Sequence, residues 1–263
     1  YGRNGEAPIP VIAAATPSDC FDMAFEAVRI ALQHMTPVIL LSDGYIANGA
    51  EPWKFPTASS LPAIEVKFKK VLDKGEDKFL PYKRNEKGAR PWAIPGTPGL
   101  EHRIGGLEKQ HETGNVNYEA ENHQFMIKMR EAKVEKIADY IPKQTIDSGA
   151  EKGKVLVLGW GSTYGTIKST LMDLQSEGKS VSHAHVKYMR PFPSNLGDIL
   201  KNFETVLIPE INNGQLIKII RDRDEYETFC NSWKAVRTIR QLFNVLKSIF
   251  GRDIARIILT KLE

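Results

Sequence analysis

The chain has few cysteines and no long apolar run. Cys20 and Cys230 are its only two cysteines among 263 residues, which excludes a disulfide framework and fits the reducing cytoplasm. Two thiolates are too few for an iron–sulfur cluster, which needs about four. No apolar run approaches the roughly 20 residues of a membrane span, and the first ten residues lack the apolar core of a signal peptide. Any iron–sulfur cluster that serves this protein is therefore expected on another chain.

A strong excess of one charge is also missing. The chain has 36 Lys and Arg against 32 Asp and Glu, for a net charge of +4. Basic residues are scattered as far as the C-terminal part, whereas a nucleic-acid interface needs a clustered basic footprint. Hydrophobic residues make up 41% of the chain, which is typical of a globular protein with a core. We expect neither nucleic acid nor a membrane as a partner.

The first part of the chain predicts a strand, a helix and a second strand. Residues 9–15 and 37–41 are short apolar strands, and residues 16–19 supply cap chemistry for a helix that ends near His34. This order predicts a parallel sheet with a right-handed crossover. Residues 45–125 then lack periodic runs, and so long a segment is typical of functional or partner-binding loops. A helix is expected at residues 121–140.

A second α/β pattern starts at Lys154. Strands are predicted at residues 155–158, 181–188 and 205–209, with helices at 166–177, 195–203 and from about 215 onward. The fold class is therefore α/β, with two parallel-sheet units joined by a long loop-rich segment. Residues 228–263 place apolar side chains at helical spacing, with seven Lys or Arg against two acids. They predict a helical tail that packs on its own domain or a neighbouring subunit, with a membrane or nucleic acid as the alternatives.

A glycine-rich turn at residues 159–165 lies between a predicted strand and a predicted helix. It resembles the phosphate-binding turn of dinucleotide folds, but its third glycine comes one residue late. The next strand ends at Lys187 and Tyr188, without the acid that binds a ribose hydroxyl. The sequence favours a tight turn in which glycine permits close strand–helix packing.

Two histidines, His183 and His185, alternate along one predicted strand and so point to the same face of the sheet. Together with His102, His111 or His123 they would supply imidazole ligands for a metal. No group of ligands has zinc-like spacing, however. Hydrogen-bonded structural histidines are the favoured interpretation, and no metal site is predicted.

Seven segments carry long, specific motifs. They are YGRNGE at residues 1–6, ATPSDC at 15–20, MTPVILLSDGY at 35–45, ARPWAIPG at 89–96, GLEHRIGGLEK at 99–109, GWGSTYG at 159–165 and PEINNGQL at 209–216. Together they resemble the α subunits of 2-oxoacid:ferredoxin oxidoreductases, and most closely the 2-oxoglutarate type. The resemblance runs from residue 1 to about residue 221, and the sequence after Arg221 departs from the ending expected for the family.

The resemblance implies four regions. Residues 1–62 would complete a thiamine-diphosphate pyrimidine-binding domain, 63–150 a connecting segment, 151–221 a transketolase C-terminal-like domain and 222–263 a helical tail. The implied reaction is the oxidative decarboxylation of a 2-oxoacid to an acyl-CoA, with electrons passed to ferredoxin. Thiamine diphosphate with Mg²⁺ would be shared with a β subunit, an iron–sulfur cluster would lie on a partner chain, and coenzyme A would be the co-substrate.

The charged loop is the first candidate site. Composition alone leaves open whether residues 99–114 face a site or form a solvated surface. With the resemblance, His102, Arg103, Glu108, Lys109 and His111 become candidates for an active-site-facing loop. Its cations would bind the second carboxylate of 2-oxoglutarate or the phosphates of coenzyme A.

The end of the second strand is a weaker candidate. Ser42, Asp43 and Asn48 follow it, and ligands bind at the carboxyl ends of strands in open parallel sheets. No catalytic residue is predicted, because the family's pyrimidine-activating glutamate and its substrate-binding threonine and arginine would lie upstream of Tyr1. The chain alone is therefore expected to be inactive.

Several alternatives remain at this point. A pyruvate or branched-chain 2-oxoacid enzyme would use the same chemistry. A non-catalytic assembly module would bind a β subunit through the loop segment and the tail. A basic nucleic-acid binder is the most distant alternative.

Overall fold

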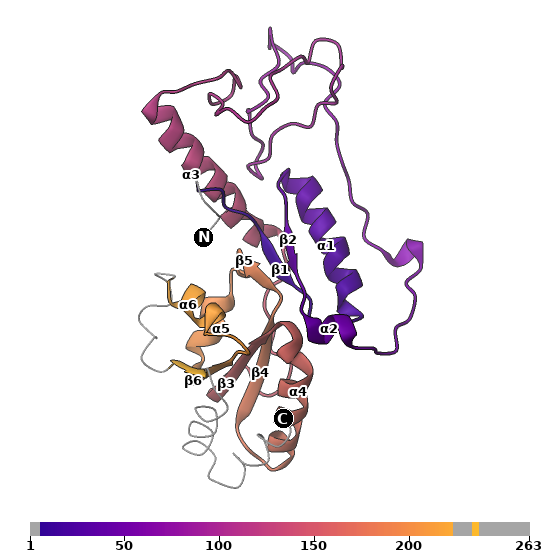
Figure 1. Cartoon of the computed structure of the whole chain (residues 1–263), viewed down its shortest axis with the longest axis vertical. Helices are drawn as coiled ribbons and strands as arrows, with labels where there is room; N and C mark the ends of the chain where they lie inside the picture. Colours follow the sequence, from indigo (N-terminus) through magenta and orange to yellow (C-terminus); the bar gives the residue numbers. More distant parts are fainter. Residues whose placement is uncertain (1–5, 223–232, 237–263) are drawn as a thin grey trace. The chain divides into compact units, whose positions relative to one another are not determined.

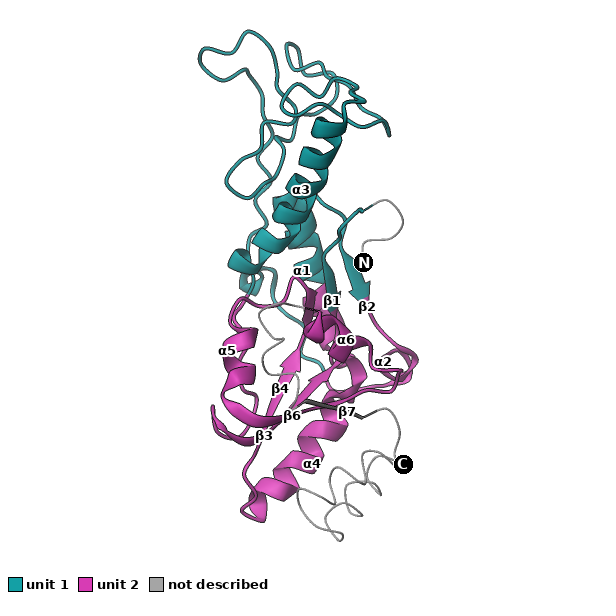
Figure 2. Ribbon diagram, turned by 90° about the vertical axis from the view of Figure 1, so that its left-hand side faces the viewer, with its two compact units in different colours: residues 1–12, 24–40, 53–141 teal, residues 13–23, 41–52, 142–263 magenta. Residues whose placement is uncertain are grey.

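The computed structural model describes residues 6–222 and 233–236. The chain forms two compact units (Figure 2). The first comprises the described parts of residues 1–12, 24–40 and 53–141, and the second those of 13–23, 41–52 and 142–263. No helix in the described part of the chain is both long enough and apolar enough to cross a bilayer.

The expected strand–helix–strand order is present, with shorter strands. Strand β1 is Val11–Ala13, helix α1 is Asp19–His34 and strand β2 is Ile39–Leu41 (Figure 1). The helix begins where the Thr16 hydroxyl accepts a hydrogen bond from the Asp19 N–H at 3.3 Å, as predicted from the cap chemistry. It ends because Met35 adopts a φ of 47°, in the left-handed region.

The expected loop-rich segment is also present. Between α2 (Gly44–Asn48) and α3 (Ala120–Lys136), the only helix is the short 3-10 turn η1 (Ala58–Ser60). Isolated bridges, such as Tyr82 with Glu112, hold parts of the segment together. Helix α3 continues into the 3-10 turn η2 (Ile137–Tyr140), so the helix expected at residues 121–140 is confirmed.

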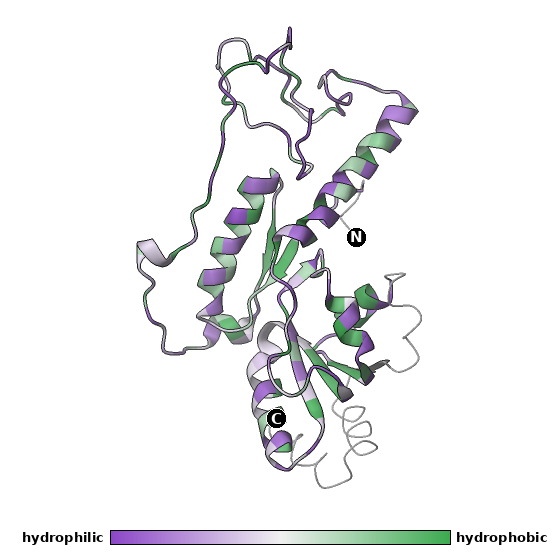
Figure 3. Cartoon of the chain, turned by 180° about the vertical axis from the view of Figure 1, so that it is seen from behind, coloured by the Kyte–Doolittle hydropathy of each residue, from purple (hydrophilic) through white to green (hydrophobic). Residues whose placement is uncertain are grey.

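The second unit contains a four-stranded sheet in the order β4-β3-β6-β7. Strands β3 (Gly153–Trp160), β4 (Val181–Val186) and β6 (Phe203–Pro209) pair in parallel, as predicted. The connecting elements are η3 (Gly161–Thr163), α4 (Tyr164–Ser176), α5 (Leu196–Lys201) and α6 (Gln215–Arg221). The strands are mainly hydrophobic (Figure 3), and Leu156 and Leu158 in β3 are fully buried.

Two expectations for this unit are wrong in detail. The strand predicted at residues 181–188 is interrupted: β4 ends at Val186, and β5 (Tyr188–Arg190) belongs to a three-stranded sheet in the order β2-β1-β5. The predicted helical tail contains a strand, β7 (Trp233–Val236), which pairs in parallel with β6. Pairing with the open edge of β6 satisfies the backbone groups of both strands and overrides the local helical spacing. The rest of the predicted tail lies outside the described residues.

Candidate functional site

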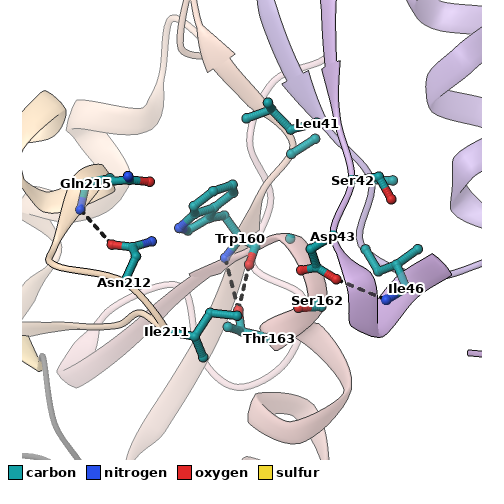
Figure 4. Close-up of a pocket in the computed structure, with 13 residues that line it drawn as sticks. Leu41, Ser42, Asp43, Ile46, Trp160, Ser162, Thr163, Ile211, Asn212 and Gln215 are labelled. Carbon is teal, nitrogen blue, oxygen red and sulfur yellow. Dashed lines mark hydrogen bonds between the residues drawn. The ribbon is translucent and has the colours of Figure 1, made fainter. Parts of the chain in front are cut away.

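A cavity of about 220 Å³ lies within the second unit. Its walls come from the last residues of strands and from the residues just after them (Figure 4). They are Ala13 and Ala14 at β1, Leu41, Ser42, Asp43 and Ile46 at β2, Trp160, Gly161, Ser162 and Thr163 at β3, and Ile211, Asn212 and Gln215 after β6. We call this cavity the strand-end pocket. Its position agrees with the rule that ligands bind at the carboxyl ends of strands in open α/β sheets.

Asp43 is the only charged residue among those that line the strand-end pocket. It caps α2, where its Oδ1 accepts the Ile46 N–H at 3.0 Å. Burial by itself raises the pKa of Asp43, but hydrogen bonds from the Ser162 side chain and from the backbone of Ile46, Tyr45 and Ser162 outweigh burial and lower it. The carboxylate therefore stays ionised at neutral pH and gives the pocket one fixed negative charge.

Trp160 supplies the aromatic surface of the pocket. Its indole Nε1 donates to Glu210 Oε1 at 3.1 Å. The same buried carboxylate accepts the backbone N–H groups of Leu216, at 2.9 Å, and Ile217, at 3.3 Å. Glu210 thus joins the first turn of α6 to the indole and holds the ring in one orientation. A planar ligand would meet an immobilised ring, which reduces the entropy lost on binding.

Two side-chain amides complete the polar lining on the side of Trp160 opposite Asp43 (Figure 4). Asn212 Oδ1 accepts the Gln215 N–H at 2.9 Å. Within the described residues, the Asn212 side-chain NH₂ and the Gln215 side chain have no hydrogen-bond partner. They remain free to bind a ligand. The Ser162 hydroxyl donates a hydrogen bond to the Asp43 carboxylate and helps to keep it ionised, and none of the described residues that line the pocket is a histidine, lysine or cysteine. Its geometry therefore suits binding rather than acid–base or nucleophilic catalysis.

The glycine turn after β3 owes its sequence to packing. A Cβ on Gly159 would lie 2.6 Å from Ile167 Cδ1 and 3.0 Å from His185 Nδ1, so a larger residue would require the Ile167 side chain to shift. Gly161 has a φ of 59°, which favours glycine. A Cβ on Gly165 would meet nothing within 4 Å. Close strand–helix packing, the interpretation favoured from the sequence, accounts for this turn.

His183 and His185 lie on β4 and are buried, with relative exposures of 0% and 6%. Both rings pack against Tyr164, at centroid distances of 5.6 and 5.0 Å. Within the described residues, neither ring nitrogen of His183 or of His185 makes a hydrogen bond of normal geometry. The Gly161 backbone approaches the His185 ring closely enough to affect its pKa, but without such a bond. The expectation of hydrogen-bonded histidines is therefore wrong. Tertiary packing of the aromatic rings, which one sequence does not reveal, takes the place of those bonds.

The two histidines are uncharged at neutral pH. Burial, and next the Lys168 charge, lower the pKa of His183 to about 4. Burial, and next the charges of His183 and Lys187, lower the pKa of His185 to about 3, and the Gly161 backbone opposes this only partly. No group of three or more potential metal ligands occurs among the residues that the structure describes.

The candidate residues of the charged loop all lie in the first unit, and four of the five have structural partners. His102 Nδ1 donates to the Leu100 carbonyl at 2.8 Å, and its ring packs edge-on against Phe79, with centroids 5.0 Å apart. Lys109 is 5% exposed and donates from Nζ to the Gly105 and Leu107 carbonyls. Its ammonium is enclosed by its own loop, which does not favour a role in binding a substrate carboxylate.

Glu108, His111 and Arg103 are placed differently. Glu108 accepts from His123 at 2.5 Å and from Arg130 at 3.4 Å, and so ties the loop to α3. The His111 ring packs on Phe125, with centroids 4.6 Å apart. Arg103 is exposed. The candidate loop role stays a prediction, and Arg103 keeps the most freedom to reach a ligand.

The second set of candidates is partly gathered in the strand-end pocket. Ser42 and Asp43 line it, whereas Asn48 does not. The Asn48 side chain instead donates to the Gly44 carbonyl within α2 at 2.7 Å. Sequence reasoning missed Trp160, Ser162, Asn212 and Gln215. The signal was present: each follows a predicted apolar strand, and the carboxyl ends of parallel strands meet at one edge.

Two family models match this chain. The first, described as "Pyruvate flavodoxin/ferredoxin oxidoreductase, thiamine diP-bdg", matches residues 3–122. The second, "Pyruvate:ferredoxin oxidoreductase core domain II", matches residues 153–254 and so extends past Arg221. The chain is also 48% identical, over 224 residues, to a 2-oxoglutarate oxidoreductase subunit KorA of Mycobacterium tuberculosis. The chain belongs to the 2-oxoacid:ferredoxin oxidoreductase α-subunit family. The α/β fold class predicted from the order of strands and helices is confirmed by the parallel sheet of the structure.

Other members of this α-subunit family are more distant. A 2-oxoglutarate synthase subunit KorA of Archaeoglobus fulgidus is 27% identical over 219 residues. A solved structure of the 2-oxoglutarate:ferredoxin oxidoreductase of Magnetococcus marinus, with 2-oxoglutarate, coenzyme A and succinyl-CoA bound, has a TM-score of 0.77 at 25% identity, and the match covers all of this chain and 44% of that one. The chain covers 33% of the mycobacterial subunit and 54% of the archaeal one, and these alignments include 85% and 83% of this chain. It therefore spans between a third and about half of these curated relatives.

Proposed function

We propose that the chain is part of the α subunit of a 2-oxoglutarate:ferredoxin oxidoreductase. The observation that carries this proposal is the 48% identity to a subunit named for that activity, over 85% of the chain. The enzyme would decarboxylate 2-oxoglutarate, transfer the acyl group to coenzyme A and pass the electrons to ferredoxin. When bound, thiamine diphosphate supplies the carbanion chemistry of this reaction.

The described residues fit a shared active site rather than a complete one. No group of three acidic, imidazole or thiolate ligands for a metal ion occurs among them, so we assign Mg²⁺ and the diphosphate to a β subunit. The two cysteines of the chain are fewer than an iron–sulfur cluster needs, which supports a cluster on a partner chain. The strand-end pocket would bind or orient a small group through Asp43, Asn212 and Gln215 without reacting with it. A cytoplasmic location is proposed with this chemistry.

The test is to produce the chain in its complete reading frame together with the β subunit of the same source. Oxoacid- and coenzyme A-dependent reduction of methyl viologen is then measured with 2-oxoglutarate, pyruvate and a branched-chain 2-oxoacid. We expect kcat/KM for 2-oxoglutarate to exceed the other two by about tenfold or more, because a site built for a second carboxylate rejects substrates that lack it. The 263-residue chain alone is expected to be inactive.

The outcomes separate the alternatives. Preference for pyruvate or a branched-chain substrate would overturn the substrate assignment and keep the reaction. A stable complex without any oxoacid-dependent reduction would favour a non-catalytic assembly module. Turnover by the isolated 263-residue chain would refute the shared active site.

A further inference from the structure

Four cations of the first unit lie together with very little negative charge. Arg84 and Arg90 come from the loop segment, and Arg130 and Lys133 come from α3. We call these four residues the cation cluster. All four are half-buried, so the fold holds their charged groups near one another without sealing them from solvent. Neither the candidate loop residues nor the strand-end pocket includes any of them.

A tight turn presents the two loop arginines side by side. The Asn85 N–H donates to the Ala89 carbonyl at 2.9 Å, which closes the turn between Arg84 and Arg90. The Asn85 side chain also accepts the Ala89 N–H at 3.0 Å. Within this turn, Gly88 packs on α3: a Cβ there would lie 3.1 Å from Lys133 Cβ. The turn is closed by the bonds between Asn85 and Ala89, and its contact with α3 at Gly88 brings the two loop arginines close to the helix.

Tyr82 aligns the two guanidinium groups. The Cζ atoms of Arg84 and Arg90 lie 5.7 and 4.6 Å from the centre of the Tyr82 ring. Such cation–π contacts hold a guanidinium in place without neutralising its charge. Arg90 donates to the Pro81 carbonyl at 3.3 Å. The arginine donors are thus fixed in orientation but not neutralised.

The cluster lacks counter-ions. Within the described residues, Arg84, Arg90 and Lys133 form no ion pair with a carboxylate. Arg84 instead contacts the His111 ring and the Met126 sulfur, at 3.4 and 3.6 Å. Lys133 donates to the Met35 carbonyl at 3.0 Å.

Only Arg130 has a carboxylate partner in the described residues. It donates to Glu108 at 3.4 Å, and Glu108 also accepts from His123. Among the described residues, the four cations of the cluster therefore share one carboxylate partner, Glu108.

The pKa values of Lys133 and Arg84 agree with a cluster whose positive charge is not balanced by nearby carboxylates. Burial, and next the charges of Arg84, Arg90 and Arg130, lower the pKa of Lys133 to about 8. Burial is also the largest cause that lowers the pKa of Arg84, and the charges of Arg90 and Arg130 add to it. A bound anion would relieve this repulsion and raise the pKa of Lys133.

We propose that the cation cluster binds a phosphoryl oxyanion. Two guanidinium groups and an ammonium lie close enough to affect one another's pKa, and together they supply the charge and the N–H donors that a phosphate or diphosphate group binds. The phosphate would belong either to a free phosphate compound or to coenzyme A. The coenzyme A source rests on the proposed function, whereas the binding site itself does not.

The experiment measures binding to the full 263-residue chain by titration calorimetry. The probes are inorganic pyrophosphate, coenzyme A and pantetheine, which lacks phosphate, with sodium chloride at equal ionic strength as the blank. We expect pyrophosphate to bind and pantetheine not to bind. Binding of coenzyme A would identify that cofactor as a source, and its failure beside binding of pyrophosphate would assign the site to a free phosphate compound.

The double variant Arg84→Gln/Arg90→Gln is expected to raise the Kd for pyrophosphate about tenfold or more. Lys128→Gln is the matched control, because Lys128 is an exposed cation on the same helix and its loss should leave Kd unchanged. Circular dichroism without ligand checks the fold. If the glutamine variant does not fold, Arg84→Lys/Arg90→Lys, which keeps the charge but removes the forks, takes its place.

Two results would each overturn the proposal that the cation cluster binds a phosphoryl oxyanion. Pyrophosphate and coenzyme A that both fail to bind the unmodified chain would overturn it. Equal binding by a folded double variant and by Lys128→Gln would do the same. Neither result depends on turnover, so the proposed oxidoreductase activity stands or falls separately.

Discussion

The loop segment at residues 53–119 and the four-stranded sheet are held together in different ways. In the sheet, fully buried apolar side chains such as Leu156 and Val206 form a continuous core. In the loop segment, polar groups make the connections: the Trp92 indole donates to the Leu32 carbonyl at 3.0 Å, and Lys109 donates to two carbonyls of its own loop. Burial is non-directional and scales with apolar area, whereas each hydrogen bond contributes only about 1 kcal/mol net.

The same comparison holds for the buried polar groups. Lys109 in the loop segment is buried with two acceptors. His183 and His185 in the sheet are buried with no hydrogen-bond partner among the described residues. An imidazole buried without a hydrogen bond costs free energy, and the large apolar area buried in the sheet offsets this cost. The loop segment buries less apolar area, so its buried polar groups depend on directed partners.

The largest expected effect comes from removing core volume in the sheet. Leu156→Ala deletes a side chain with 0% exposure and should lower the free energy of unfolding by about 2–5 kcal/mol. Leu107→Ala is the matched change in the loop segment, where Leu107 is 58% exposed, and should cost less than about 0.5 kcal/mol. Urea unfolding followed by circular dichroism measures both. Equal losses would mean that the two regions are not stabilised differently.

The next effect tests how closely β3 and α4 pack. Gly159→Ala should lower the free energy of unfolding by about 1–3 kcal/mol, because the new methyl group would overlap Ile167 and press on His185. Gly165→Ala, in open space on α4, should be neutral or stabilising by about 0.5–1 kcal/mol. Thermal unfolding of the two variants measures both effects. If the Gly159→Ala protein is as stable as the unmodified chain, the turn shifts to accommodate the methyl group and the packing is not tight.

The third effect is a pH dependence of the sheet, which is spread over several pH units. The folded pKa values of His183 and His185, about 4 and 3, lie below the unfolded value of about 6.5. The unfolded state therefore binds more protons below pH 6.5, and stability is complete above that pH. It falls as the pH decreases towards about 4, by at most about 1.4 kcal/mol per pH unit for each histidine.

Unfolding curves between pH 7.5 and 4.5 measure this dependence. The variant His183→Gln/His185→Gln should lose the part of the slope that belongs to the two imidazoles. If the variant keeps the same dependence of stability on pH as the unmodified chain, the two histidines are protonated or hydrogen-bonded in the folded sheet. The contrast with the well-partnered Lys109 would then be wrong.

Much of the architecture could be predicted from the sequence. The apolar runs around Ile39 and Leu156 and the cap at Thr16 predict their strands and helix, because local periodicity and capping act over a few residues. The family motifs also led to the α-subunit family. The strand Trp233–Val236 was missed because its partner, β6, is chosen by tertiary pairing rather than by local spacing.

The candidate site was predicted less completely. Ser42 and Asp43 were found because they end an apolar strand, but Trp160 and Asn212 were not joined to them. Their meeting depends on the order of the strands, which pairwise spacing along the chain does not contain. Lys109 is a different case: charge density predicted a ligand contact, and in the structure its ammonium donates to the carbonyls of its own loop, so the predicted contact remains a prediction.

The sequence by itself determined most of the strands and helices, the loop-rich character of the middle segment and the family, because these depend on local composition and on motifs that are contiguous in the chain. The tertiary structure alone decided which side chains meet: the strand-end pocket around Trp160, the partnerless imidazoles of β4 and the cation cluster on α3. The physical reason is that burial and unbalanced charge are properties of groups brought together from distant positions, and a sequence lists those groups without their distances.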